Sequence, residues 1–183
     1  MELDFEHLLD NKGNWKDNLK KTLSKDFVVI LPSMPNKSNA QYPEWKIWFE
    51  KLIPHCRTGL ILVGHSLGGI FLAKYLSENI FPKKISAVFL VAAPYDIRSA
   101  HNRLASFGLP AKLVRLQEQV AKIFIYHSQD DPVVPVIAAK NYQHALPGAV
   151  VKIFKNKQHF NQATFPEIVK TINSPSKRAR MSP

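Results

Sequence analysis

The amino-acid sequence predicts an α/β fold, a three-layer α/β/α sandwich in which helices cover both faces of a mostly parallel sheet. Short apolar runs bounded by turn residues alternate along the chain with segments of helical periodicity. That alternation is typical of a parallel sheet, because the crossover between two parallel strands usually carries a helix. With 183 residues, 45% of them hydrophobic and 21% charged, the chain is long enough to bury such a core in one domain.

Five apolar runs are the expected strands of the sheet. Four of them are almost continuously apolar, as strands buried on both faces are. These four span residues 27–31, 60–63, 87–92 and 123–126, and the fifth is Val150–Phe154. The fifth run alternates more between apolar and polar side chains, which favours a place at the edge of the sheet.

Segments of helical periodicity separate these runs. In the first, Trp15, Leu19 and Leu23 recur at i, i+4 and i+8 and would share one helix face. The second spans residues 45–53 and is expected to stop at Pro54, because proline cannot continue a helix. Further helices are expected over residues 67–76, 136–146 and 165–172.

Residues 95–120 interrupt this alternation. The segment is polar at first and then carries Gly108-Leu109-Pro110, so we expect a long loop with a short helix after the carboxyl end of a strand. Loops at that edge of a parallel sheet are where α/β proteins bind ligands. Residues 174–183 are rich in proline, serine and basic residues and are expected to form a disordered basic tail, which leaves a single domain over residues 1–173.

A glycine-rich motif, Gly64-His65-Ser66-Leu67-Gly68-Gly69, follows the expected strand 60–63 and leads into the next helix. Gly-x-Ser-x-Gly between a strand and a helix indicates a nucleophile elbow, which exposes a serine hydroxyl on a strained turn. We expect Gly64 and Gly68 to prevent collisions with the helix or the sheet. The backbone N–H of Leu67 is expected to donate to an oxyanion, aided by the positive end of the helix. His65 is expected to pack or to support the catalytic residues from behind, rather than to act as the base.

A serine nucleophile needs a base and a carboxylate that orients the base, in the chain order serine, acid, histidine on this kind of fold. Two adjacent carboxylates, Asp130 and Asp131, follow the expected strand 123–126. We favour Asp131 as the acid, because its spacing to Pro135 matches the usual acid loop. Asp130 is the alternative acid. If Asp131 is the acid, we expect Asp130 to form hydrogen bonds within the loop.

The predicted base is His159, in a loop between the last strand and the last helix. His127 and His144 are the rival bases. His127 lies on the acid loop itself and His144 falls inside a helical segment, so both are expected to pack.

Together these motifs resemble the compact α/β-hydrolases, the family that includes retinoblastoma-binding protein nine and its bacterial relatives. The resemblance covers roughly residues 15–172 and rests on the order and spacing of the motifs. The matching residues are Trp15, Met34-Pro35-Asn36, Trp45, Gly64-His65-Ser66-Leu67-Gly68-Gly69, Ala92-Ala93-Pro94, Asp130-Asp131-Pro132-Val133-Val134-Pro135 and His159-Phe160. The resemblance implies an α/β-hydrolase fold without a large cap domain, a serine triad, no metal and no cofactor. It also implies hydrolysis of small esters, with thioesters and amides as further candidates.

Two departures from the family's pattern concern the site. Family members begin with an apolar strand ending in His-Gly, whose loop supplies a second oxyanion donor, but residues 1–10 contain no such strand and His7 is followed by leucine. We therefore expect the first strand to be missing, with a chain that is either truncated or diverged at its start, and Leu67 to be the one strong donor. Losing such a donor costs about a hundredfold or more in rate. Gln158 stands where a glycine usually precedes the histidine, which is expected to tighten or shift that loop. The retinoblastoma-binding motif Leu-x-Cys-x-Glu is absent around Cys56, so that partner is not expected.

The charge balance, 25 Lys and Arg against 14 Asp and Glu, gives a net charge of +11. Such a field attracts nucleic acid, acidic membranes or anionic substrates. The lysines are spread along the chain without a basic helix carrying interleaved aromatics, so we expect a solvated surface and no specific nucleic-acid site.

No apolar run is long enough to span a membrane, the acidic start lacks the features of a secretory signal, and Cys56 is the one cysteine. These features predict a cytoplasmic protein, a monomer or weak dimer.

The sequence thus predicts a serine hydrolase that cleaves a small-molecule ester through an acyl-enzyme on Ser66. Tyr95 and Phe107 of the long loop are expected to offer apolar surface to the substrate. The alternative is a catalytically impaired interaction protein that keeps the fold and uses its basic surface. An intact triad favours the enzyme, and a missing N-terminal strand favours the interaction protein.

Overall fold

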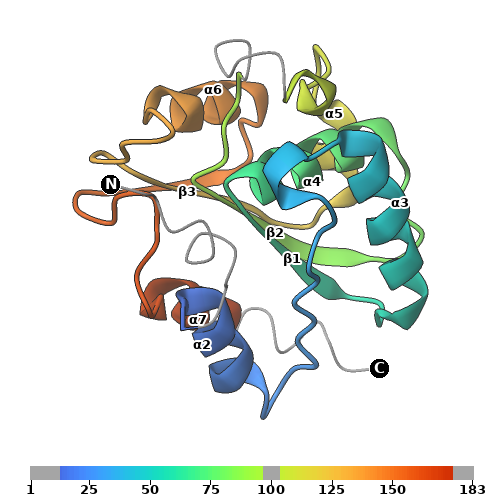
Figure 1. Cartoon of the computed structure of the whole chain (residues 1–183), viewed down its shortest axis with the longest axis horizontal. Coiled ribbons are helices and arrows are strands. Elements are labelled where there is room, and N and C mark those ends of the chain that lie inside the picture. The colour runs from blue at the N-terminus through green and yellow to red at the C-terminus, as the bar shows by residue number, and fades with distance from the viewer. Residues whose placement is uncertain (1–12, 97–103, 175–183) are drawn as a thin grey trace. The chain divides into compact units, whose positions relative to one another are not determined.

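A parallel sheet of four strands organises the central part of the chain (Figure 1). The structure is a computed structural model that describes residues 13–96 and 104–174. The strands are β1 (Leu60–His65), β2 (Ile85–Val91), β3 (Ile123–Ser128) and β4 (Val150–Phe154), and they lie side by side in chain order, all parallel. The predicted parallel α/β class is confirmed.

From β1 onward helices alternate with these strands in the order that the sequence predicts, whereas α2 (Trp15–Leu23) and α3 (Tyr42–Leu52) follow one another before β1. The helices after β1 are α4 (Leu67–Glu78), α5 (Val114–Gln119), α6 (Ile137–Ala145) and α7 (Pro166–Ile172), and single 3₁₀ turns lie at Lys37–Asn39, Ile53–His55 and Ala105–Phe107. The fold divides into two units: one is Ser38–Phe160, and the other joins Met1–Lys37 to Asn161–Pro183.

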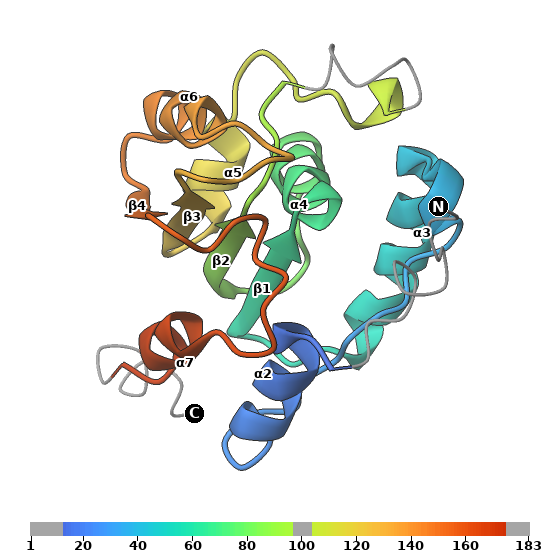
Figure 2. The ribbon, with the colours of Figure 1, turned by 60° about the vertical axis from the view of Figure 1, so that its left-hand side comes forward.

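The sheet unit is built around β2 and β3, the two inner strands, which are almost entirely buried. Val88, Phe89 and Leu90 of β2 are fully buried, which is why this segment of the sequence is continuously apolar. Helix α4 connects β1 to β2 and packs on both strands, while α6 packs on β3 (Figure 2). Because all four strands run the same way, their carboxyl ends gather at one edge of the sheet, and the loops that leave this edge carry the candidate site.

The smaller unit pairs α2 with α7. Asn14 caps α2 by accepting from the backbone N–H of Lys16 at 2.9 Å, and Trp15, Leu19 and Leu23 are all buried, as their spacing predicts. Trp15 packs edge-to-face on Phe165, with ring centroids 5.4 Å apart.

The expected strand at residues 27–31 is wrong. The segment is neither helical nor paired in a ladder, and Val28 is 78% exposed. A run of apolar and β-branched residues shows only that a segment would be stable within a sheet. A strand also needs hydrogen bonds to a neighbouring strand, and the run does not specify that neighbour. The ladders of the described residues join the other four expected strands alone.

The expected long loop holds the turn Ala105–Phe107 and α5, as far as it is described. Residues 97–103 of this loop and 175–183 of the expected tail lie outside the described residues. Of the helices in the described ranges, none is long and apolar enough to cross a membrane.

Candidate active site

Ser66 stands between the end of β1 and the start of α4, in a strained backbone conformation. Its φ of 53° and ψ of −122° lie in a region that side-chain-bearing residues rarely adopt. Its N–H donates to the carbonyl of Val91 on β2 at 2.8 Å, and its carbonyl accepts from the N–H of Gly69 at 2.8 Å. The turn is thus fastened to the sheet on one side and to the helix on the other.

The glycines of this turn do not share one role. A Cβ on Gly64 would lie 2.4 Å from the carbonyl oxygen of Gly68, and a Cβ on Gly69 would lie 2.5 Å from the Cβ of Ala93. A Cβ on Gly68 would meet no atom within 4 Å. The expectation that Gly64 and Gly68 jointly prevent collisions is therefore wrong for Gly68. Gly64 and Gly69 are the two that permit the close approach of strand and helix.

Leu67 is the first residue of α4, directly after Ser66. The N–H groups of a helix's first turn have no carbonyl partner within the helix, and they carry its positive end. The N–H of Leu67 therefore belongs to the positive end of α4, directly beside Ser66. The segment expected to affect the second donor, residues 1–10, lies outside the described residues.

Asp131 occupies the turn that follows β3, with its side chain fully buried. Its Oδ1 accepts from the backbone N–H of Val133 at 2.8 Å and of Val134 at 2.9 Å. His127, at the end of β3, donates from Nε2 to the carbonyl of Val134 at 2.8 Å. The bonds from Val133 and Val134 hold the carboxylate in place, and the bond from His127 holds the backbone of the same turn.

His159 joins the serine to the acid. Its Nδ1 lies 2.9 Å from Oδ2 and 3.1 Å from Oδ1 of Asp131, and its Nε2 lies 2.9 Å from Oγ of Ser66. Because an ionised carboxylate can only accept, Nδ1 carries the proton in this arrangement, and Nε2 is left to accept from the serine hydroxyl. The structure thus brings Ser66, His159 and Asp131 into one hydrogen-bonded chain.

The rival acid and bases occupy other positions. Asp130 contacts the loop before His159 rather than an imidazole ring: its Oδ1 accepts from Ser128 Oγ at 2.5 Å and from the N–H of Gln158 at 2.9 Å. The Ser128 hydroxyl is the main cause that lowers the pKa of Asp130. His127 is buried, as expected, whereas His144 lies exposed in the last turn of α6, so the expectation that it packs is wrong.

His65 and Ser128 contact this site in ways that the sequence does not reveal. His65 donates from Nε2 to the backbone carbonyl of His159 at 2.8 Å. The Ser128 hydroxyl accepts from the N–H of Lys157 at 2.9 Å. Neither contact leaves a signal in the sequence beyond a polar residue at the carboxyl end of a strand.

Of the two expected substrate-wall residues, one is excluded by burial. Phe107 is fully buried and packs edge-to-face on Tyr42 and Trp45, which contradicts the expectation that it offers surface to a substrate. Tyr95 is half-buried and packs edge-to-face on Tyr142, with ring centroids 4.9 Å apart. Burial raises the pKa of Tyr142, whose hydroxyl donates to the carbonyl of Pro94 at 2.8 Å.

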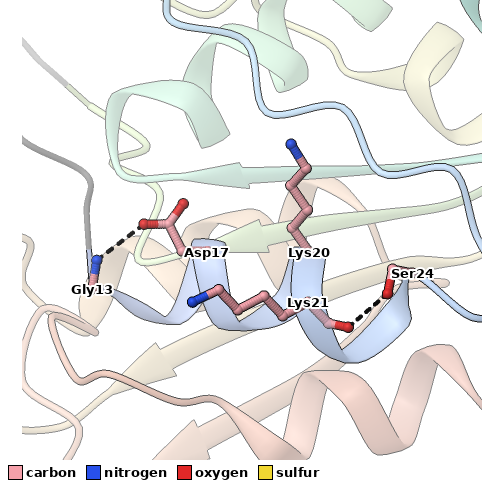
Figure 3. Close-up of a pocket in the computed structure, with 5 residues that line it drawn as sticks. All are labelled: Gly13, Asp17, Lys20, Lys21 and Ser24. Carbon is pink, nitrogen blue, oxygen red and sulfur yellow. Dashed lines mark hydrogen bonds between the residues drawn. The ribbon is translucent and has the colours of Figure 1, made fainter.

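A separate hollow lies on α2, in the smaller unit (Figure 3). It is lined by Gly13, Asp17, Lys20, Lys21 and Ser24, and two local hydrogen bonds join lining residues: Gly13 N–H to Asp17 at 3.0 Å, and Ser24 Oγ to the carbonyl of Lys21 at 2.9 Å. None of its lining residues is a predicted site residue. Over residues 13–96 and 104–174, no cluster of three or more His, Cys, Asp or Glu side chains could hold a metal ion.

Comparisons with known proteins point to one family and one fold. A family model described as serine hydrolase matches residues 10–169. Serine hydrolase RBBP9 of Rattus norvegicus is 25% identical over 164 residues, which cover 87% of this chain and 85% of that protein. Among solved structures, the ydeN gene product of B. subtilis is similar with a TM-score of 0.80 at 20% identity, covering 91% of both chains. The α/β hydrolase MGS-MChE2, from a sediment metagenome of the lagoon of Mar Chica, Morocco, is similar with a TM-score of 0.65 at 17% identity, covering 94% of this chain and 88% of the other. The expected α/β-hydrolase fold is confirmed.

Proposed function

The chain belongs to the serine hydrolase family, and we propose that it cleaves small carboxylic esters through an acyl-enzyme on Ser66. One observation carries the proposal: Ser66 Oγ, both ring nitrogens of His159 and the carboxylate of Asp131 form a continuous chain with distances of 2.9 Å at each link. Such a chain is the geometry by which a serine hydroxyl becomes a nucleophile.

In the acylation half, His159 Nε2 accepts the proton of Ser66 as Oγ attacks the ester carbonyl carbon. The carbonyl oxygen becomes an oxyanion, to which the N–H of Leu67 donates. Asp131 stays ionised and stabilises the imidazolium through Nδ1. As the tetrahedral intermediate collapses, the bond to the alcohol oxygen breaks, and His159 gives its proton to that oxygen.

In the deacylation half, water takes the place of the alcohol. His159 Nε2 accepts a proton from the water, whose oxygen attacks the acyl carbon. Collapse of the second tetrahedral intermediate breaks the bond to Ser66 Oγ, which recovers its proton from His159. The products are a carboxylic acid, an alcohol and the free enzyme, so no cofactor enters the balance.

Esters are proposed rather than amides because an ester carbonyl is the more electrophilic of the two and its alkoxide leaves more readily than an amine, so acylation depends less on oxyanion stabilisation by the one assigned donor. Activated esters such as p-nitrophenyl acetate should therefore be cleaved well, and unactivated esters and amides slowly. Of the two expected substrate contacts, Tyr95 stays a prediction.

A fluorophosphonate probe tests the proposal, because it modifies activated serines covalently. We expect stoichiometric labelling that mass spectrometry maps to Ser66, together with turnover of p-nitrophenyl acetate, both absent in Ser66→Ala. Labelling at another serine would refute the assignment. A chain that resists the probe and lacks turnover would instead support an interaction protein that keeps the fold and binds partners through its net charge of +11.

A further inference from the structure

The loop that carries His159 is strained on both sides of the histidine. Gln158 has a φ of 46° and Phe160 a φ of 55°, so both flanking residues adopt the left-handed conformation that favours glycine. Two such residues cost on the order of 1–3 kcal/mol each, and they persist where other contacts hold them. One bond within the loop, from the N–H of Phe160 to the carbonyl of Lys157 at 2.9 Å, supports this backbone, and side chains outside the loop add to it.

Ser128 and Asp130 provide that added support. The Ser128 hydroxyl donates to Asp130 Oδ1 at 2.5 Å and accepts from the N–H of Lys157 at 2.9 Å. Asp130 Oδ1 also accepts from the N–H of Gln158 at 2.9 Å. The two consecutive backbone amides before His159 are thus bound by one linked pair of side chains.

The pair stands on the same short stretch of chain as Asp131. Ser128 is the last residue of β3 and is fully buried, so it moves with the sheet. Asp131, three residues later, binds the ring of His159, while Asp130 binds the backbone that carries this ring. The backbone before His159 and the ring of His159 are therefore both bonded to the turn that follows β3. This leaves the ring little freedom to turn away from Ser66.

We propose that Ser128 and Asp130 are positioning residues, which hold the backbone of the histidine loop so that His159 Nε2 stays within reach of Ser66 Oγ. This inference rests on the proposed hydrolase function. It gives the two adjacent carboxylates separate tasks: Asp131 orients the imidazole, and Asp130 never contacts it but sets where its backbone lies.

Four single variants of the full chain test the proposal: Asp130→Ala, Asp130→Asn, Ser128→Ala and Gln129→Ala. Gln129 is the matched control, because it lies between the two positions with an exposed side chain, and the bond from its N–H to the carbonyl of Phe154 is a backbone bond that alanine keeps. For each variant we would measure kcat and KM on p-nitrophenyl acetate, the rate of fluorophosphonate labelling and the thermal unfolding temperature. The low-field proton resonance of His159 Nδ1–H adds a readout that needs no turnover.

Asp130→Ala should lower kcat and the labelling rate by about 10- to 100-fold with KM within about twofold, because misplacing a catalytic group by about 1 Å costs up to a hundredfold. Ser128→Ala should lose roughly tenfold, since Asp130 can still accept from Gln158. Asp130→Asn keeps an acceptor oxygen and should recover to within about threefold of wild type. The Nδ1–H resonance should broaden in Asp130→Ala and stay sharp in Gln129→Ala.

Equal kcat in Asp130→Ala and Gln129→Ala would overturn the proposal, and so would a loss confined to KM. If Asp130→Ala does not fold, Asp130→Asn and Ser128→Ala carry the test, and wild-type kcat in Ser128→Ala with an unchanged Nδ1–H signal would overturn it. Failure of the hydrolase function appears elsewhere, as a wild-type chain without labelling or turnover.

Discussion

The nucleophile elbow, residues 64–69, and the histidine loop, residues 157–160, have similarly strained backbones, but different features of the molecule stabilise them. Each has a side-chain-bearing residue with a φ near 50° beside a reacting group: Ser66 in the elbow, Gln158 and Phe160 in the loop. The elbow secures its geometry mainly with its own residues, through the absent side chains of Gly64 and Gly69 and the start of α4. The histidine loop is held by side chains from elsewhere in the chain: Ser128 and Asp130, about 28 residues earlier, and His65, 94 residues earlier.

The difference shows which active-site geometry a local sequence can encode. A strained backbone that depends on glycines can be predicted from the sequence of the strained segment, because the glycines lie within it. A strained backbone that is held by hydrogen bonds cannot, because the bonding side chains come from other segments that only the fold brings together. The elbow should therefore be sensitive to substitutions within it, and the loop to substitutions at Ser128 and Asp130.

The largest expected effect is the loss of the nucleophile. Ser66→Ala and Ser66→Gly should both abolish fluorophosphonate labelling and lower kcat by about six orders of magnitude, as loss of a triad serine does elsewhere. The free energy of unfolding should be about 1 kcal/mol larger for the glycine variant than for the alanine variant, because glycine relieves the strain at a φ of 53°. Chemical denaturation of both variants measures the difference, and equal stabilities would mean that the elbow stores no strain at this residue.

The second prediction separates the two carboxylates of the acid loop. Asp131→Asn should lower kcat about ten-thousandfold, because the amide no longer selects the imidazole tautomer with Nδ1 protonated. Asp130→Asn should lose only a few-fold, since its oxygen can still accept from the N–H of Gln158. Steady-state kinetics on p-nitrophenyl acetate decides the matter. A reversed order of severity would mean that the acid is misassigned.

The third prediction concerns the glycines of the elbow. Gly64→Ala places a Cβ 2.4 Å from the Gly68 carbonyl oxygen and should destabilise the fold by about 3 kcal/mol, with loss of labelling. Gly68→Ala meets open space within α4 and should stabilise the fold by about 0.5–1 kcal/mol through helix propensity. Urea unfolding of both variants tests this contrast. Similar losses at both positions would show that the elbow is not held by steric exclusion at Gly64 alone.

The smallest expected effect lies in the histidine loop. Gln158→Gly should stabilise the fold by about 1 kcal/mol relative to Gln158→Ala, because glycine adopts a φ of 46° without steric cost. The bond from the residue 158 N–H to Asp130 is a backbone bond and survives both substitutions. Thermal unfolding of the two variants compares them directly. A less stable glycine variant would mean that this loop bears no strain at residue 158.

The sequence predicted the order of four strands and the helices between them, because apolar periodicity and turn residues are local properties of those segments. It also placed Ser66, Asp131 and His159 on loops that the structure brings to one edge of the sheet, since parallel strands direct their carboxyl ends there. It failed at residues 27–31, because an apolar run does not name its ladder partner. It failed at Phe107 because an aromatic residue on a loop can equally join a core, here against Tyr42 and Trp45.

The bond from His65 to the carbonyl of His159 joins the elbow directly to the histidine loop. The donor ring is the chain neighbour of Ser66, so the proposed nucleophile and the proposed base are positioned against each other as well as against the sheet. A histidine loop transplanted into a related scaffold would lose its register unless residue 65 came with it. Loop and elbow are thus coupled by one direct bond, although 94 residues of chain separate the two bonded groups.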